Sequence, residues 1–211
     1  MQLYYHPFAS NARRPLLVAE QLGIALDLVE INLLDPADRR RLEQVNPNSK
    51  LPVLVDGDFV LWESCAIMQY LCDITPGQTL FPRDARKRAD VNRWLFWTCQ
   101  HFAPAVRVLV WENLFKGMTG KGGPDPVALA RGAADIATLA QVFDQHLEGR
   151  IWITGEALTL ADFAVATPLI HLEQARLPVT GYANLIDWFE RVKALGAWQQ
   201  AAATAAQPAM A

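Results

Sequence analysis

The sequence predicts an α/β domain followed by an all-α domain, and three observations support this. In about the first eighty residues, short apolar runs typical of strands alternate with helical patterns. An Asp-Gly pair lies between two of the apolar runs and indicates a β-hairpin. Beyond residue 84 the spacing of the apolar residues is helical throughout.

The elements of the first domain occur in the order strand, helix, strand, helix, hairpin, helix. The predicted strands are QLYYH, DLVEI, LPVLV and FVLW, at residues 2–6, 27–31, 51–55 and 59–62. The predicted helices cover Leu16 to Leu22, the region near Ala37 to Val45, and about Glu63 to Cys72. Asp56-Gly57-Asp58 joins the last two strands. A βαβ unit followed by a ββα unit is the order of a thioredoxin-like domain.

The predicted domain boundary lies in a stretch that prolines and a glycine interrupt. Residues 77–84 show no sustained apolar period, which indicates a linker. We therefore predict that residues 1–76 form the thioredoxin-like domain. Residues 85–211 are predicted to form an all-helical bundle.

The predicted helices of the second domain are 85–115, 126–147, 159–172 and 186–203, with the Gly-rich KGMTGKGGPDP as a loop. Pro104 is expected to kink the first of them, because proline lacks a backbone donor and crowds the preceding turn. The Ala-rich stretch after Ala201 is expected to be frayed.

One helix start is specified unusually well. Thr159 and Asp162 have the spacing of a capping box, in which each side chain bonds the other residue's backbone. Leu158 and Phe163 occupy the positions of a hydrophobic staple. We interpret this motif as a folding signal and not as a catalytic one.

Composition excludes several classes of function. The net charge of −3 gives no basic face for nucleic acid. The N-terminus does not resemble a signal peptide and no apolar run approaches a membrane span, so we expect a cytoplasmic protein that does not bind membranes. Three cysteines without CxxC spacing, and histidines without a shared helical spacing, predict neither a disulfide framework nor a metal site.

A proline marks the first candidate ligand-binding segment. Pro52 stands just before a strand, where it cannot donate to the sheet, so we expect an edge or turn and a cis Leu51–Pro52 bond. The turn cluster at residues 46–49 leads the chain into this edge. The backbone of Leu51 is then predicted to pair with an extended peptide ligand.

The second candidate segment is the start of the helix after FVLW. Unpaired amides at a helix N-terminus favour an anion, so Ser64 is placed to bind a ligand carboxylate. Glu63 adds a charge that attracts an ammonium group. Together they suit the α-amino acid end of a peptide, although a plain acidic helix start is the simpler interpretation of Glu63 and Ser64 taken alone.

The motifs NPNSKLPVL, WESCAI and LTLADF together resemble the cytosolic glutathione transferase superfamily, and they span both halves of the chain. The resemblance implies that glutathione is the co-substrate. It implies that Leu51, next to Pro52, pairs with the cysteinyl backbone of glutathione and that Glu63 and Ser64 hold its γ-glutamyl end. Lys50, and less directly Ser49, are expected near the glycyl carboxylate.

The resemblance also implies that a residue near the first helix activates the glutathione thiol. Ser10 is the first choice, because Ser10 and Arg13 have the spacing of the serine-type, theta- and delta-like members. Asn11 is the reserve donor, and Tyr5 is a weaker alternative that is expected to pack in the first strand. Ser10 could instead simply cap the helix.

The resemblance places the second substrate on the first long helix of the helical domain. The candidates are Trp97, His101, Phe102, Arg107, Trp111 and Phe115. We expect Phe102, Arg107 and Trp111 to contact it, with Arg107 and Trp111 as the pair to test. An arginine there suits a small electrophile that carries an anionic or polar group.

The expected protein is therefore a glutathione transferase that attacks a small electrophile and forms a homodimer, as the family usually does. The alternative is a non-catalytic binding or regulatory protein with the same fold. Glutathione-dependent peroxide reduction, dehalogenation and isomerisation also remain open at this stage.

Overall fold

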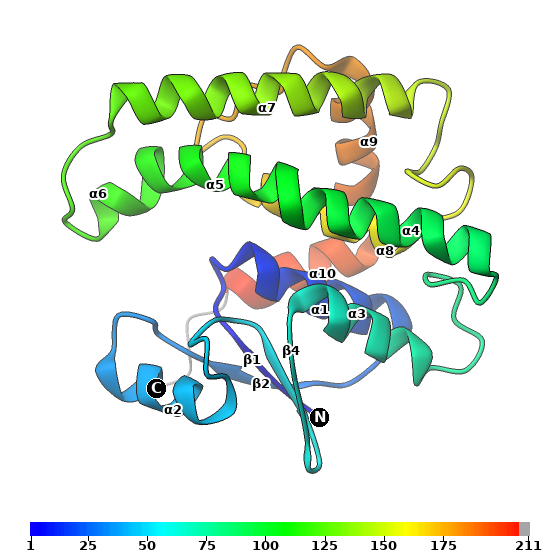
Figure 1. Ribbon diagram of the computed structural model, residues 1–211. Coiled ribbons are helices and arrows are strands. Elements are labelled where there is room, and N and C mark those ends of the chain that lie inside the picture. The colour runs from blue at the N-terminus through cyan, green and yellow to red at the C-terminus, as the bar shows by residue number, and fades with distance from the viewer. Residues whose placement is uncertain (207–211) are drawn as a thin grey trace. The chain divides into compact units, whose positions relative to one another are not determined.

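The computed structural model describes residues 1–206, which form two compact units (Figure 1). One unit contains residues 1–81 and resumes at residue 194, and the other contains residues 82–193. This division differs from the predicted domains at the C-terminal end. Helix α10 (Gly196–Ala206) packs against α1 (Ser10–Leu22), so it belongs with the first unit and not with the helical one.

The first unit is built on a four-stranded sheet in the order β2-β1-β3-β4. Its strands are β1 (Gln2–Tyr5), β2 (Asp27–Glu30), β3 (Val53–Asp56) and β4 (Phe59–Trp62). β1 runs parallel to β2 and antiparallel to β3, and β3 forms a hairpin with β4. These are the strands and the hairpin that the sequence predicts, so the thioredoxin-like fold is confirmed.

Helices cover both faces of this sheet (Figure 1). On one face α1 packs against α3 (Ser64–Asp73). On the other, Leu42 of α2 (Pro36–Val45) is fully buried beside Ile31 and Val53. α1 continues through Pro15, although that proline suggests an irregular first turn.

The second unit consists of helices and their connections, as predicted. Its helices are α4 (Ala85–Trp97), α5 (Ala103–Val110), α6 (Lys116–Met118), α7 (Pro126–Leu147), α8 (Leu160–Ala166) and α9 (Ala183–Lys193). Two π-helical turns, η1 (Thr98–Phe102) and η2 (Trp111–Phe115), and a 3₁₀ turn, η3 (Thr167–His171), adjoin them. None of the helices within residues 1–206 is both long enough and apolar enough to cross a bilayer.

Residues 85–115 are helical without a break, as predicted, but the hydrogen-bond pattern changes from α-helical to π-helical at η1 and again at η2. At η1 the amide of Ala103 donates to the carbonyl of Thr98, five residues back, which widens the helix just ahead of Pro104. Proline cannot supply the next regular hydrogen bond, so the widened turn lies where a distortion is expected. The helix predicted over residues 186–203 is instead two helices, α9 and α10, separated at residues 194–195.

The end of the chain also differs from expectation. α10 continues beyond Ala201 to Ala206. Trp198 and Ala201 are buried, so this helix has an inward face that the alanine content conceals. The part of the predicted frayed stretch at residues 207–211 lies outside the described residues.

The core of the second unit is aromatic. Phe143 of α7 contacts Trp188 of α9 edge-on at 5.0 Å between ring centroids. Phe102 stacks on Trp97 at 5.3 Å, and both rings also approach Phe143. Phe102, Phe143 and Trp188 have no exposed surface, so these rings fix how α4, α7 and α9 pack together.

The predicted capping box is present at the start of α8. Asp162 accepts hydrogen bonds from the amide and the hydroxyl of Thr159, at 2.9 and 3.3 Å. Its other oxygen accepts from the amide of Ile153 and from Nε1 of Trp188, each at 2.9 Å. Burial raises the pKa of Asp162, and the four hydrogen bonds oppose that rise. The motif therefore joins α8 to α9 and to the preceding loop.

A second buried carboxylate holds the Gly-rich loop predicted between residues 116 and 126. Glu112 Oε2 accepts from Lys116 Nζ and from the amide of Asp125, each at 2.7 Å. These hydrogen bonds, from Lys116 and then Asp125, lower the pKa of Glu112. Lys116 and Asp125, at the two ends of the loop, thus donate hydrogen bonds to the same oxygen atom of Glu112.

Candidate active site

The three segments predicted to bind glutathione leave the sheet at the same end. Val53 at the start of β3 pairs with Tyr4 of β1 on one side and with Trp62 of β4 on the other. Adjacent strands lie about 4.8 Å apart, so these strand ends are close neighbours. The predicted segments lie just after β1, just before β3 and just after β4, and the sheet therefore brings them together.

The segment before β3 contains the predicted cis peptide bond, between Leu51 and Pro52. Asn46 shapes the turn in front of it. Its side chain is 2% exposed, donates to the carbonyl of Lys50 at 2.7 Å and accepts from the amide of Asn48 at 3.0 Å. The predicted turn cluster is thus a hydrogen-bonded support for the residues that follow it.

The main chain of Leu51 is available to a ligand. Neither its amide nor its carbonyl bonds to another of the residues 1–206. Lys50 is exposed and Ser49 is half-buried, with a φ of 51° at Ser49. This geometry suits a peptide that pairs with Leu51 as an added strand.

Glu63 has an unusual backbone conformation. Its φ of 75° and ψ of 110° lie outside the regions that residues with a side chain normally adopt, and it immediately precedes α3. Its side chain is exposed and makes no hydrogen bond to the described residues. Such a conformation costs about 1–3 kcal/mol and is most often found at functional sites.

Ser64, the first residue of α3, is buried and has a partner that the sequence did not indicate. Arg14 of α1 donates from Nη1 to Ser64 Oγ at 3.1 Å, and the two residues are 2% and 4% exposed. The prediction considered Arg13 and missed Arg14. An arginine within the apolar face of a helix needs a polar partner, and that signal could have identified it.

Ser10 is the first residue of α1, and it is half-buried. The residue that caps this helix is Ala9, which offers no side-chain oxygen. Among residues 1–206, no hydrogen bond involves the Ser10 hydroxyl, so the helix does not use Ser10 as its cap. Asn11 is exposed.

The residues around Ser10 are partly shielded from water. Tyr5 is buried, as expected for the first strand, and burial followed by the charge of Glu30 raises its pKa. Burial lowers the pKa of His6, with Glu30 acting in the opposite direction, and burial lowers the pKa of Arg13. The Nδ1 atom of His6 accepts from the amide of Phe8 at 3.2 Å, which orders the turn before α1.

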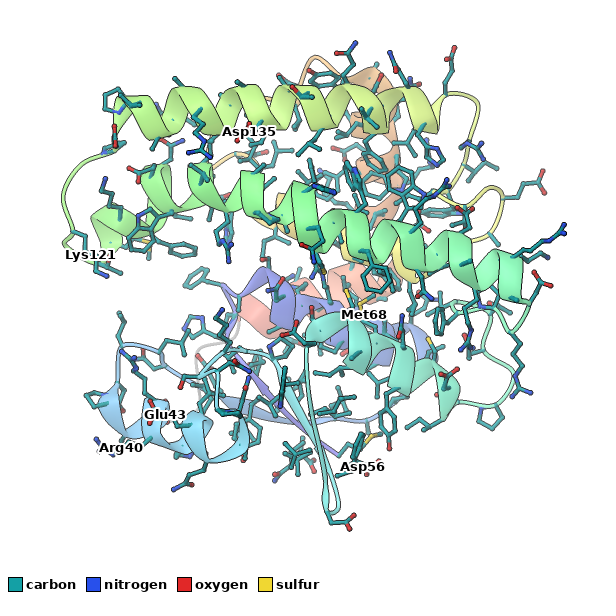
Figure 2. All side chains as sticks on the ribbon, viewed as in Figure 1. Arg40, Glu43, Asp56, Met68, Lys121 and Asp135 are labelled. Atoms are coloured by element: carbon teal, nitrogen blue, oxygen red, sulfur yellow. The ribbon has the colours of Figure 1, made fainter. Side chains whose placement is uncertain are left out.

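In the second unit, Arg107 and Trp111 lie four residues apart along α5 and η2, which is the spacing of neighbours on a helix. Arg107 is exposed and Trp111 is half-buried. Lys121, in the loop between α6 and α7 (Figure 2), holds its ammonium group 5.2 Å from the centre of the Trp111 ring. The Trp111 ring thus has one cationic side chain beside it, that of Lys121, and Arg107 precedes it by four residues along the helix.

Phe102, unlike Arg107 and Trp111, is completely buried. Its side chain has no exposed surface and stacks on Trp97 in the aromatic core. It therefore offers no surface to a substrate, and we leave it out of the proposed acceptor site. Helical spacing alone could not separate a core ring from a ligand-facing one.

No cluster of three or more metal-ligating side chains occurs among the described residues. Within residues 1–206 none of the three cysteines is in a disulfide, and Cys65 lies beside Ser64 at the start of α3.

Comparison with known proteins identifies the family. The profile of the glutathione S-transferase N-terminal domain matches residues 1–73, and that of the C-terminal domain matches residues 126–191. Glutathione S-transferase 3 of Zea mays is 31% identical over 215 residues, covering 99% of this chain and 96% of the relative. Glutathione S-transferase theta-2 of Rattus norvegicus is 31% identical over 207 residues, covering 93% and 82%.

The structure agrees with this. A delta-class glutathione transferase of Nilaparvata lugens superposes with a TM-score of 0.83 at 29% identity, covering 98% of this chain and 94% of the other. The similarity extends over both units of the chain. The chain therefore belongs to the cytosolic glutathione transferase superfamily.

Proposed function

We propose that this glutathione transferase binds glutathione at the end of its sheet and that Ser10 stabilises the thiolate for attack on a small electrophile. The γ-glutamyl end lies at Glu63 and Ser64, and the cysteinyl backbone pairs with Leu51 beside Pro52. The glycyl carboxylate lies near Lys50 and Ser49. The convergence of the three segments at one end of the sheet is the observation that carries this proposal.

The γ-glutamyl site has the polarity that an amino acid needs. The Glu63 side chain does not cap α3, so the amides at the start of that helix and the Ser64 hydroxyl supply donors for the carboxylate. Glu63 supplies the opposite charge for the ammonium group. Its unusual backbone conformation supports a role in binding, because the helix does not need that conformation to form.

Thiol activation at Ser10 requires a modest free energy. Lowering a thiol pKa from about 8.5 by two units needs about 2.7 kcal/mol of preference for the anion. A charge-assisted hydrogen bond contributes about 1.5–3 kcal/mol, and the N-terminus of α1 adds a smaller amount. Ser10 therefore acts as a donor and need not ionise. A serine-type mechanism also agrees with the theta and delta classes of the two relatives named above.

The acceptor is proposed to contact Arg107 and Trp111. The indole ring offers a stacking surface to an aromatic electrophile, and Arg107 and Lys121 offer positive charge to an anionic or strongly polar substituent. A panel of aryl halides with and without a carboxylate would rank these preferences.

Calorimetric titration with glutathione and with S-hexylglutathione tests the proposed site. Both ligands are expected to bind, and Glu63→Gln and Ser64→Ala are each expected to weaken binding about 10- to 100-fold, because each removes a charge-assisted contact. Glu156→Gln, an exposed carboxylate of the second unit, is the control and should bind normally. Failure of both ligands to bind the wild type would reject the site.

We also propose that the protein is a cytoplasmic homodimer, as this family usually is. Phe59, Val60 and Trp62 of β4 expose 45%, 41% and 39% of their surfaces, which is unusual for three residues of one short strand. Light scattering is expected to give twice the chain mass of 23.5 kDa. Val60→Lys should shift the measured mass toward that of the monomer. Val127→Lys, at an exposed valine of α7, should leave the mass unchanged. A monomeric wild type would contradict the proposal.

A further inference from the structure

The contact between Arg14 and Ser64 joins two elements far apart in the sequence. Arg14 lies on the inward side of α1 and Ser64 opens α3, and these two helices pack against each other. Both side chains are more than nine-tenths buried. A buried guanidinium keeps its charge and needs acceptors around it, and the Ser64 hydroxyl oxygen is one of them.

The chemistry of the two groups fixes the direction of the hydrogen bond. A guanidinium only donates, whereas a hydroxyl has one proton to donate and two lone pairs that accept. Because Arg14 Nη1 occupies a lone pair of Ser64 Oγ, the serine proton cannot point at Arg14. That proton remains for an acceptor on another side of the oxygen.

The acceptor implied by this geometry is an anion at the start of α3. Glu63, the N-cap residue, makes no side-chain cap, so the first amides of the helix are not satisfied by that side chain. A carboxylate bound there would receive the Ser64 proton and would lie one hydroxyl away from the Arg14 charge. The hydroxyl would also be a stronger donor because its oxygen is polarised by a cation.

We propose that Arg14 is a positioning residue for the γ-glutamyl carboxylate of glutathione, which it reaches through Ser64. It sets the orientation of the Ser64 hydroxyl and adds a positive charge behind it. This inference rests on the proposed glutathione site and adds a residue to it. Arg14 touches Ser64 and is not assigned a contact with the ligand or with the thiol.

The test compares two ligands that differ only in this carboxylate. 4-Aminobutyryl-Cys-Gly retains the amine, the cysteine and the glycine of glutathione but lacks the γ-glutamyl α-carboxylate. Arg14→Met is expected to weaken glutathione binding about tenfold or more, as loss of a charge-assisted contact does, while binding of the analogue changes less than twofold. Arg14→Lys, which retains the charge, should recover part of the difference.

A double-mutant cycle tests whether Arg14 acts through Ser64. If Arg14 acts through Ser64, Arg14→Met should have little further effect in the Ser64→Ala background, because the hydroxyl that it orients is gone. Leu17→Ala, at a fully buried neutral position of α1, is the packing control. It should weaken both ligands by the same factor, as a general disturbance of α1 would.

The possible failures are distinct. If wild type does not bind glutathione, the proposed function fails and this assignment fails with it. If wild type binds but Arg14→Met and Arg14→Lys weaken both ligands equally, Arg14 is only structural and the assignment alone is overturned. If the losses from Arg14→Met and Ser64→Ala add, Arg14 does not act through Ser64.

Discussion

Asp162→Ala is expected to destabilise the second unit by about 4 kcal/mol or more, because buried donors that lose their acceptors cost about 1–3 kcal/mol each. Asp162 is fully buried, and its carboxylate accepts from two amides, a hydroxyl and an indole. Without it, the amide of Ile153 and the Nε1 atom of Trp188 are left in the core. A change of this size is a large part of the stability of an ordinary domain.

Urea unfolding followed by tryptophan fluorescence measures this effect, since Trp188 lies beside the site. Asp125→Ala is the matched control, because that aspartate caps α7 through a hydrogen bond to Val127 and is exposed. The Asp125→Ala variant should lose about 1 kcal/mol of unfolding free energy. If Asp162→Ala loses no more than the control, the carboxylate is a local cap and does not join the helices.

Ser10→Ala is expected to lower kcat/KM for an aryl halide about 10- to 100-fold and to raise the pKa of the bound glutathione thiol by about one to two units. Both follow from removing a charge-assisted hydrogen bond of about 1.5–3 kcal/mol, because 1.36 kcal/mol corresponds to one pKa unit or to a tenfold rate. Glutathione affinity should change less, because the main-chain and carboxylate contacts remain.

The ultraviolet absorbance of the bound thiolate, recorded against pH, gives this pKa directly. Ser10→Thr keeps the hydroxyl and should keep most of the activity. Asn11→Ala should leave the titration within a few tenths of a unit, because Asn11 is exposed. An unchanged titration in Ser10→Ala, with a shift in Asn11→Ala, would transfer the donor role to Asn11.

The sequence predicts the first unit well because its signals are local. Asp56-Gly57 sets the hairpin and Pro52 marks the cis bond, and each acts through its own backbone geometry. The capping box at Thr159 and Asp162 is equally local. Such signals need no knowledge of what lies across the fold.

The features that the sequence does not predict depend on which other residue each side chain meets in the fold. Helical spacing groups Phe102 with the large apolar residues of its helix but does not tell whether its ring meets a substrate or, as it does, other aromatic rings. The bond from Arg14 to Ser64 spans fifty positions of the chain, so no local pattern contains it. The positive φ of Glu63 is likewise not a conformation that glutamate itself favours, so the residue type does not predict it.

The packing of α10 on α1 has a consequence for how the protein is made. During synthesis the residues of α1 leave the ribosome early, whereas Trp198 and Ala201, on the buried side of α10, are among the last described residues to do so. The first unit therefore stays incomplete while all of the second unit is translated. A fragment that ends near residue 81 would leave part of α1 uncovered, and apolar surface of this kind promotes aggregation.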